Sequence, residues 1–383
     1  MLFLLLISIL LSTSFVQTKL GVYATKKINE SYNTNLSIGK VNLSFLGSVA
    51  FKDVQIRDHH KDTLIFVSAL NTSLLSAKKV LNNQLLFGDI TLQDAQYYMK
   101  TYKGETEDNM AVFLNSFNSN KKKDSLAPKF ILKAANVYVQ NLDFKLINEN
   151  NKKPLSFAAY KIGGNVQDLS IEGANVSINA RGLHFETNQG LEITNFTTDY
   201  KFTKTDMKFY DTQLQTENSN VFGDIDFTYK REDLKEFNDK VDIRAKFDKS
   251  SIKIQDLKKF YKELNGNDVV SFSGDMNGKL NDFKLTNLNL SSEKGIKLKG
   301  NLAFKNVVNT ERGFVFNGDL NNLTATYNDL KSILPNLLGK NLPTEFNKLG
   351  LFRIAGNVNV TPTRMRASLK MNSQIGSVVS DLE

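Results

Sequence analysis

The stretch Gly39–Leu75, GKVNLSFLGSVAFKDVQIRDHHKDTLIFVSALNTSLL, decides the fold class. Apolar residues occupy every second position on both sides of one polar turn, RDHHKD. Alternation with a period of two is typical of half-buried antiparallel strands. The alternation slips by one residue between Phe51 and Val54, which is the kind of slip that a β-bulge absorbs.

The same pattern recurs over most of the 383 residues. Helical periodicity is confined to a few short segments, of which residues 107–117 and 251–264 are the clearest. A weak internal repeat reads apolar, variable, Gly, Asp or Asn, apolar, and it opens both Phe272–Leu290 and Phe316–Leu334. Repeats of this kind indicate supersecondary units whose apolar faces cover one another. We therefore expect a mostly β, antiparallel protein with few short helices.

The first 18 residues, MLFLLLISILLSTSFVQT, carry no charge. A helix that spans a bilayer takes about 20 apolar residues, so this run is near the lower limit. A cleavable signal peptide would have a positive n-region, and no basic residue precedes the run. We favour a retained transmembrane anchor over a cleaved signal peptide, with the helix extending to about residue 34. The anchor residues are Leu2, Phe3, Leu4, Leu5, Leu6, Ile7, Ile9, Leu10, Leu11, Phe15 and Val16.

The composition argues against several kinds of chemistry. The chain has no cysteine, which excludes disulfides, thiolate metal sites and lipoprotein anchors. The net charge of +9 is scattered among acidic residues, and no basic face with interleaved aromatics indicates nucleic-acid binding. No phosphate-binding loop and no nucleophile motif is present. We expect no enzymatic activity, no catalytic residue and no cofactor.

His59 and His60, flanked by Asp58 and Asp62, form the one cluster that resembles a metal site. Adjacent side chains on an extended chain point to opposite sides, so two neighbouring histidines rarely share one ion. We interpret the pair as part of a polar turn between two strands and predict no metal site. The remaining histidine, His184, lies within a predicted strand and is expected to face outward.

The alternation admits two architectures. One is an ordinary β-sandwich with a closed core. The other is a long, curved sheet whose apolar face stays open, so that acyl chains lie against it while head groups stay in water. Shielding a lipid tail from water is worth about 0.8 kcal/mol per CH₂. In the open sheet, the residues expected to line the apolar groove are Val41, Leu43, Phe45, Leu64, Phe66, Leu70, Val137, Val139, Ile225 and Phe227.

The N-terminal part of the chain, Tyr23–Tyr98, resembles the start of the TamB (translocation and assembly module) family, within the AsmA-like group. The matching pieces are Ile38–Leu43, Phe51–Asp58, Asp62–Ile65 and Leu74–Leu75. The later openings FSGDMNGKL and FRIAGNVNV are similar to the same group.

The resemblance implies an elongated, folded-over antiparallel sheet with an apolar interior, a β-taco. It implies a single-pass protein of the bacterial inner membrane with its body in the periplasm, which carries phospholipids between the inner and outer membranes and supports outer-membrane biogenesis. The implied partners are phospholipid acyl chains, the inner membrane and an Omp85-type outer-membrane barrel, reached through a C-terminal part that is not recognisable here. The expected organisation is an anchor at 1–18, an AsmA/TamB-like β unit at 35–120 and repeated β-groove segments at 129–383, continuing in a longer protein.

Two other functions fit a β-rich chain. A scaffold for outer-membrane protein assembly or secretion would act with an Omp85-type barrel and offer sheet edges for strand addition. An adhesin-like surface protein would have a closed core. A continuous aliphatic groove without buried charge favours lipid transport, and unpaired polar edges favour the scaffold.

Overall fold

The computed structural model describes residues 14–44, 48–74, 84–119, 131–173, 175–259, 266–333 and 344–382. The chain divides into two compact units, Met1–Thr203 (unit 1) and Lys204–Glu383 (unit 2). The sequence placed a boundary between residues 120 and 129, which lies inside unit 1. The strands on either side of that segment pair directly with each other, and this pairing holds them in one unit.

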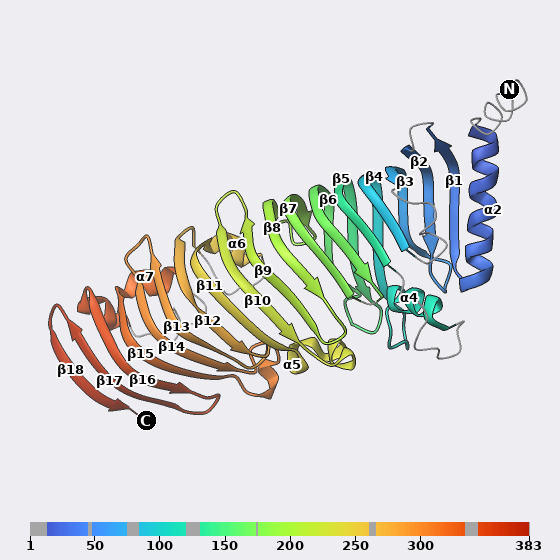
Figure 1. The fold of residues 1–383 in the computed structure, drawn as a ribbon. Helices are drawn as coiled ribbons and strands as arrows, with labels where there is room; N and C mark the ends of the chain where they lie inside the picture. The colour runs from blue at the N-terminus through green and yellow to red at the C-terminus, as the bar shows by residue number, and fades with distance from the viewer. Residues whose placement is uncertain are drawn as a thin grey trace, which may run out of the picture. The chain divides into compact units, whose positions relative to one another are not determined.

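Unit 1 is built from strands that follow one another in chain order, each paired with the strand before it (Figure 1). Helix α4 lies where the sequence predicted a helix, and the mostly β class with few short helices is confirmed. The elements are α2 (Ser14–Tyr32), β1 (Asn35–Leu43), β2 (Ser48–Arg57), β3 (Thr63–Leu74), β4 (Gln84–Thr101), α4 (Asn109–Ser119), β5 (Ile131–Asn148), β6 (Leu155–Glu172), β7 (Asn175–Thr187) and β8 (Glu192–Phe202).

Strands β4 and β5 are an exception to the antiparallel pairing. They run parallel, from Gln84 opposite Ile131 to Thr101 opposite Asn148. Parallel neighbours need a crossover connection of a dozen or more residues, and residues 102–130, which include α4, provide it. The expectation of antiparallel pairing is wrong for β4 and β5. Side chains alternate with a period of two in parallel and antiparallel strands alike, so the pattern does not distinguish them.

The predicted slip in β2 is present as one residue with a left-handed backbone. Asp53, between Phe51 and Val54, has a φ of 53°. Asp94 in β4 (φ 49°) and Asn141 in β5 (φ 64°) have the same left-handed backbone. The Asn141 side-chain amide donates a hydrogen bond of 2.6 Å to the Asp94 carboxylate. Asp and Asn adopt this conformation more readily than other residues with a side chain. Because of the slip, apolar side chains on both sides of it point to the same face.

Helix α2 covers the free edge of β1. The Gln17 side-chain amide accepts a hydrogen bond from the Leu43 backbone N–H (2.6 Å) and donates one to the Leu43 carbonyl (3.0 Å). The Asn29 side-chain amide accepts a hydrogen bond from the Leu36 backbone N–H (2.8 Å) and donates one to the Leu36 carbonyl (2.7 Å). These amides replace the peptide groups of a missing neighbour strand, so the edge is not left open for pairing with another chain.

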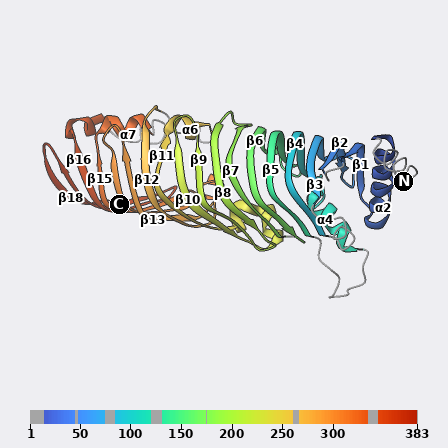
Figure 2. The same cartoon turned by 45° about the horizontal axis from the view of Figure 1, so that its top comes forward.

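Unit 2 is an antiparallel succession of strands in chain order. Helices α6 and α7 lie at one set of strand ends and α5 lies at the opposite set (Figure 1 and Figure 2). The elements are β9 (Asp206–Gln215), β10 (Asn220–Thr228), η1 (Arg231–Glu236), α5 (Phe237–Lys240), β11 (Asp242–Lys253), α6 (Ile254–Lys258), β12 (Val269–Gly278), β13 (Phe283–Ser292), β14 (Lys297–Lys305), η2 (Thr310–Arg312), β15 (Val315–Ala325), α7 (Tyr327–Ile333), η3 (Thr344–Leu349), β16 (Phe352–Val360), β17 (Met365–Ser373) and β18 (Gly376–Leu382).

Two glycines that precede an asparagine lie at close contacts between strands of unit 2. Gly300 (φ 157°) and Gly356 (φ 133°) lie where two backbones approach closely. A Cβ atom at these positions would overlap the carbonyl oxygens of Asp319 and Ser368, respectively. Asn301, which follows the first glycine, donates a hydrogen bond of 3.4 Å to the Asp319 carboxylate. Gly300 and Gly356 therefore permit the close approach, and Asn301 links β14 to β15.

The predicted anchor falls largely outside the described residues. This applies to every anchor residue from Leu2 to Leu11, whereas Phe15 and Val16 belong to helix α2. No helix in the described part of the chain combines the length and the apolar character needed to cross a membrane.

Replacing Gly356 by alanine should destabilise unit 2 more than replacing Gly376. Both glycines have φ in the left-handed region, but a Cβ at position 376 meets nothing within 4 Å. In urea unfolding we expect Gly356→Ala to cost about 1–3 kcal/mol more than Gly376→Ala, because overlap with a backbone carbonyl adds to the conformational strain. Equal losses for the two variants would contradict the close approach of the strands.

Asn29→Ala should open the edge of β1. Without the side-chain amide, the Leu36 N–H loses its partner, so we expect faster hydrogen exchange at that amide and more self-association. Lys26→Ala, on an exposed part of the same helix, is the control and should change neither quantity. Unchanged exchange at Leu36 in Asn29→Ala would refute the capping role of the helix.

Candidate functional site

One uncharged row of residues crosses every strand of unit 2. In the strand register each member lies directly opposite the next, from β9 to β18. The first row consists of Phe209, Ile225, Ala245, Met276, Leu285, Leu302, Gly318, Val358, Ala367 and Leu382. All of its side chains are apolar, so this line across the sheet contains no charge and no hydrogen-bonding group from a side chain.

A second apolar row runs beside the first on the same face, two residues away along each strand. Its phenylalanine rings are in contact: the ring centroids of Phe283 and Phe304 lie 5.0 Å apart, and those of Phe304 and Phe316 lie 5.3 Å apart. The second row consists of Met207, Phe227, Ile243, Gly278, Phe283, Phe304, Phe316, Val360 and Met365.

A third row lies beyond the slips and is partly covered by helices. Leu330 of α7 and Leu349 of η3 pack against a buried cluster that contains Phe352. Because those elements sit at the strand ends, the cover lies at one rim of the sheet. The third row consists of Phe272, Leu290, Leu298, Leu323, Ile354, Met371 and Val378. The three rows together are called the apolar face of unit 2 below.

The larger side chains of the first row are only partly buried, whereas Ala245, Gly318 and Ala367 are buried. Leu285, Leu302 and Val358 keep part of their surface accessible, and Leu382 is 53% exposed. Side chains between two packed sheets interdigitate at interior density and are nearly inaccessible. The apolar face of unit 2 is therefore partly open to solvent.

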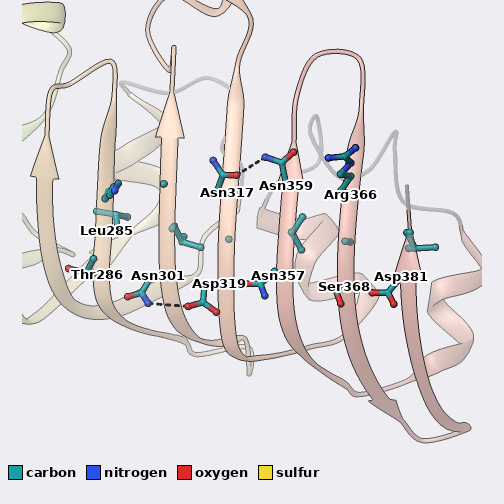
Figure 3. A pocket seen from close by; sticks show the side chains of 17 residues that line it. Leu285, Thr286, Asn301, Asn317, Asp319, Asn357, Asn359, Arg366, Ser368 and Asp381 are labelled. Carbon is teal, nitrogen blue, oxygen red and sulfur yellow. Dashed lines mark hydrogen bonds between the residues drawn. The ribbon is translucent and has the colours of Figure 1, made fainter.

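The opposite face of the same strands is polar. One of its rows passes through Asn317 and Asn359, whose side-chain amides share a hydrogen bond of 2.6 Å (Figure 3). A shallow hollow of about 740 Å³ lies against β13 to β18, and its lining combines Leu285, Leu302 and Arg366 with these polar residues (Figure 3). The polar row consists of Lys208, Asp226, Arg244, Asn277, Lys284, Ala303, Asn317, Asn359 and Arg366.

Unit 1 has apolar rows of its own on one face of its strands. The best-packed part is a cluster of Ile90, Ala134, Val137 and Val139, which Leu70 and other half-buried residues surround. One row consists of Val41, Phe51, Leu70, Leu92, Val139 and Gly164. Another consists of Leu43, Val49, Thr72, Ile90, Val137, Val166, Ala180 and Thr198.

Most of the residues that the sequence suggested as groove lining lie in these rows. They are Val41, Leu43, Leu70, Val137 and Val139 in unit 1, and Ile225 and Phe227 in unit 2. Phe45 lies outside the described residues.

Phe66 is misplaced in the sequence-based assignment. Phe66 lies opposite Gln55 and Gln96, on the face away from the apolar rows. Leu64 lies at an irregularity in the β2–β3 register and is fully buried. The slip that follows in β3 brings Leu70 back to the apolar face. A one-residue slip moves every side chain beyond it to the other face. Strict counting with a period of two therefore assigned Phe66 to the same face as Leu70.

Two tyrosines on the apolar side of unit 1 stay neutral. Burial is the main cause that raises the pKa of Tyr97 above its ordinary value, and burial raises the pKa of Tyr200 to about 12. The Tyr97 hydroxyl donates to the Met99 sulfur at 3.7 Å. Neither ring therefore brings a charge to this face at neutral pH.

A separate polar cluster lies at the turn between β2 and β3. The Nε2 atoms of His59 and His60 lie 2.9 and 2.6 Å from the two carboxylate oxygens of Glu105. The predicted turn is present, but the expectation that the two rings point to opposite sides is wrong, because both residues lie within the turn and not on an extended strand. Hydrogen bonds from His60, and then from His59, lower the pKa of Glu105, so its carboxylate is charged at neutral pH.

Glu105 was not identified from the sequence. It lies 45 residues after His60, and only the pairing of β3 with β4 brings the two turns together. A contact between residues so far apart in the sequence cannot be predicted from the spacing of neighbouring residues. His184 is exposed, as predicted.

No family model, no curated protein and no solved structure matches this chain.

Proposed function

We propose that this protein holds phospholipid acyl chains against the apolar face of its sheet and carries phospholipids between the inner and outer membranes of a diderm bacterium. The observation that supports this most is the uncharged first row, which continues over all the strands of unit 2 and keeps its larger side chains partly exposed. In a water-facing protein, an apolar surface of this kind is a candidate for binding a partner.

The dimensions of the row suit acyl chains. Neighbouring strands lie about 4.8 Å apart, so a row across β9 to β18 is about 43 Å long. The hydrocarbon core of a bilayer is about 30 Å thick, and one acyl chain covers about half of that. The row is thus longer than a single acyl chain. Each CH₂ group that is shielded from water contributes about 0.8 kcal/mol, so a continuous row lowers the barrier to movement along the sheet.

The architecture in this proposal is a folded-over sheet, a β-taco whose interior is the apolar face. The slips in neighbouring strands support it, because bulge-like residues bend a strand and increase its local twist. Asp94 and Asn141 lie side by side in adjacent strands, so a bend at one strand continues into the next.

The proposed location and partners follow from the resemblance to the TamB family. The apolar run Met1–Thr18 would anchor the protein in the inner membrane, and the sheet would lie in the periplasm. An Omp85-type barrel in the outer membrane would be the partner at the other end. No catalytic step and no cofactor belong to this proposal.

The alternative function is a scaffold that supports outer-membrane protein assembly by strand addition. One observation favours it: among the described strands, β18 pairs only with β17, and Val379 on β18 is 78% exposed. An exposed strand of this kind can pair with an extended segment of another protein. Its exposed residues are largely apolar, whereas the scaffold hypothesis called for polar edges.

Leu302→Asp should remove bound lipid, whereas Ala303→Asp should not. The two residues are neighbours on β14, one in the first apolar row and the other in the polar row. We would purify the full chain from a bacterial periplasm in mild detergent, extract it with organic solvent and quantify phospholipid by mass spectrometry. We expect at least about a tenfold loss for Leu302→Asp, since a charge beside an acyl chain costs more than 1.4 kcal/mol.

The wild-type chain is compared with an unrelated β protein that is purified identically, and circular dichroism verifies that both variants are folded. Phospholipid in the wild type at the level of that control would contradict lipid binding and would leave the scaffold as the better hypothesis. Equal losses in the two variants would show that the bound lipid does not lie on the apolar face.

A further inference from the structure

We propose that His59, His60 and Glu105 form a binding site for a first-row divalent transition-metal ion of the Zn²⁺ class. The site does not depend on the proposed lipid function. Two imidazole nitrogens and one carboxylate converge here: the ligand atoms all lie within 4.8 Å of one another, and each Nε2 contacts a different oxygen of Glu105. A charged carboxylate only accepts hydrogen bonds, so both Nε2 atoms carry protons in the metal-free arrangement.

The turn that carries the histidines is held by a buried carboxylate. Asp58, which is 2% exposed, accepts hydrogen bonds through Oδ1 from the backbone N–H groups of His60 (3.0 Å) and Asp62 (2.9 Å). Its Oδ2 lies 2.7 Å from the Tyr102 hydroxyl and 2.8 Å from the Asn109 amide nitrogen, and both donate to it. The positions of both histidines are therefore fixed by the backbone before any ion binds.

The ring orientations are also fixed. The Tyr102 ring, 8% exposed, stacks on His60 with a centroid distance of 3.8 Å and meets His59 edge-on at 5.5 Å. The Glu105 N–H donates to the Tyr102 carbonyl at 3.0 Å, and Asn150 donates to the Glu105 carbonyl at 3.0 Å. Metal sites gain affinity from outer groups of this kind, which keep the ligands in place.

The ligand set determines the class of metal. Imidazole nitrogen with one carboxylate suits Zn²⁺, Cu²⁺ and Ni²⁺, whereas Mg²⁺ and Ca²⁺ prefer an all-oxygen shell. On binding, each imidazole offers the lone pair of Nε2 to the ion, so the proton that faces Glu105 leaves Nε2. The three side chains are 28%, 45% and 32% exposed, which lets an ion enter and leaves positions for water. The ion would join the β2–β3 turn to the segment after β4.

The test is isothermal titration of ZnCl₂ into the full chain, purified in mild detergent without a histidine tag and first dialysed against a chelator. We expect one saturable site per chain. Glu105→Gln and the double variant His59→Ala/His60→Ala should weaken binding at least tenfold. The matched controls are His184→Ala, which removes the remaining histidine, and Glu107→Gln, which removes a nearby carboxylate; both should bind like the wild type.

A second measurement does not depend on titration heats. The temperature of unfolding should rise with ZnCl₂ and not with MgCl₂ in the wild type and in both controls, and it should not rise in Glu105→Gln. Absence of saturable Zn²⁺ binding to the wild type would overturn the proposal, and so would equal binding by Glu105→Gln. In either case the three side chains would form a hydrogen-bonded cluster only.

Discussion

Mid-strand residues with a left-handed backbone keep the apolar side chains of long, bent strands on one face. Without the slip at Asp53, Asp94 and Asn141, strict alternation would send the residues beyond it to the polar side. In unit 2 glycine takes this position in some strands, as at Gly274, and Asp211, Lys249 and Asn287 take it in others. The continuous apolar rows, and with them the proposed lipid function, depend on this local geometry.

The edge of β1 is closed by the amides of Gln17 and Asn29, which bind the strand's backbone groups. An edge that side chains cap in this way is protected from pairing with other chains. In the described part of the chain, β18 pairs with β17 and exposes Val378 and Val379.

Much of the fold follows from local pattern. The β class and the slip after Phe51 were readable from alternation and the helix α4 from helical periodicity, since all three depend on neighbouring residues. The parallel pairing of β4 with β5, the face of Phe66 and the contact of Glu105 with His60 were not readable. Each of these depends on which strands pair and in which register, and a single sequence without a structure does not contain that information explicitly.

In the proposed function, acyl chains lie on the apolar face of the sheet and not on the polar one. The chain has no tryptophan, so a single introduced tryptophan reports on its own position. Phe304→Trp places the probe in the second apolar row, and Asn317→Trp places it in the polar row of the next strand. With phospholipid carrying bromine on its acyl chains, we predict strong quenching for Phe304→Trp and little for Asn317→Trp. Equal quenching of the two probes, or none of either, would contradict the claim.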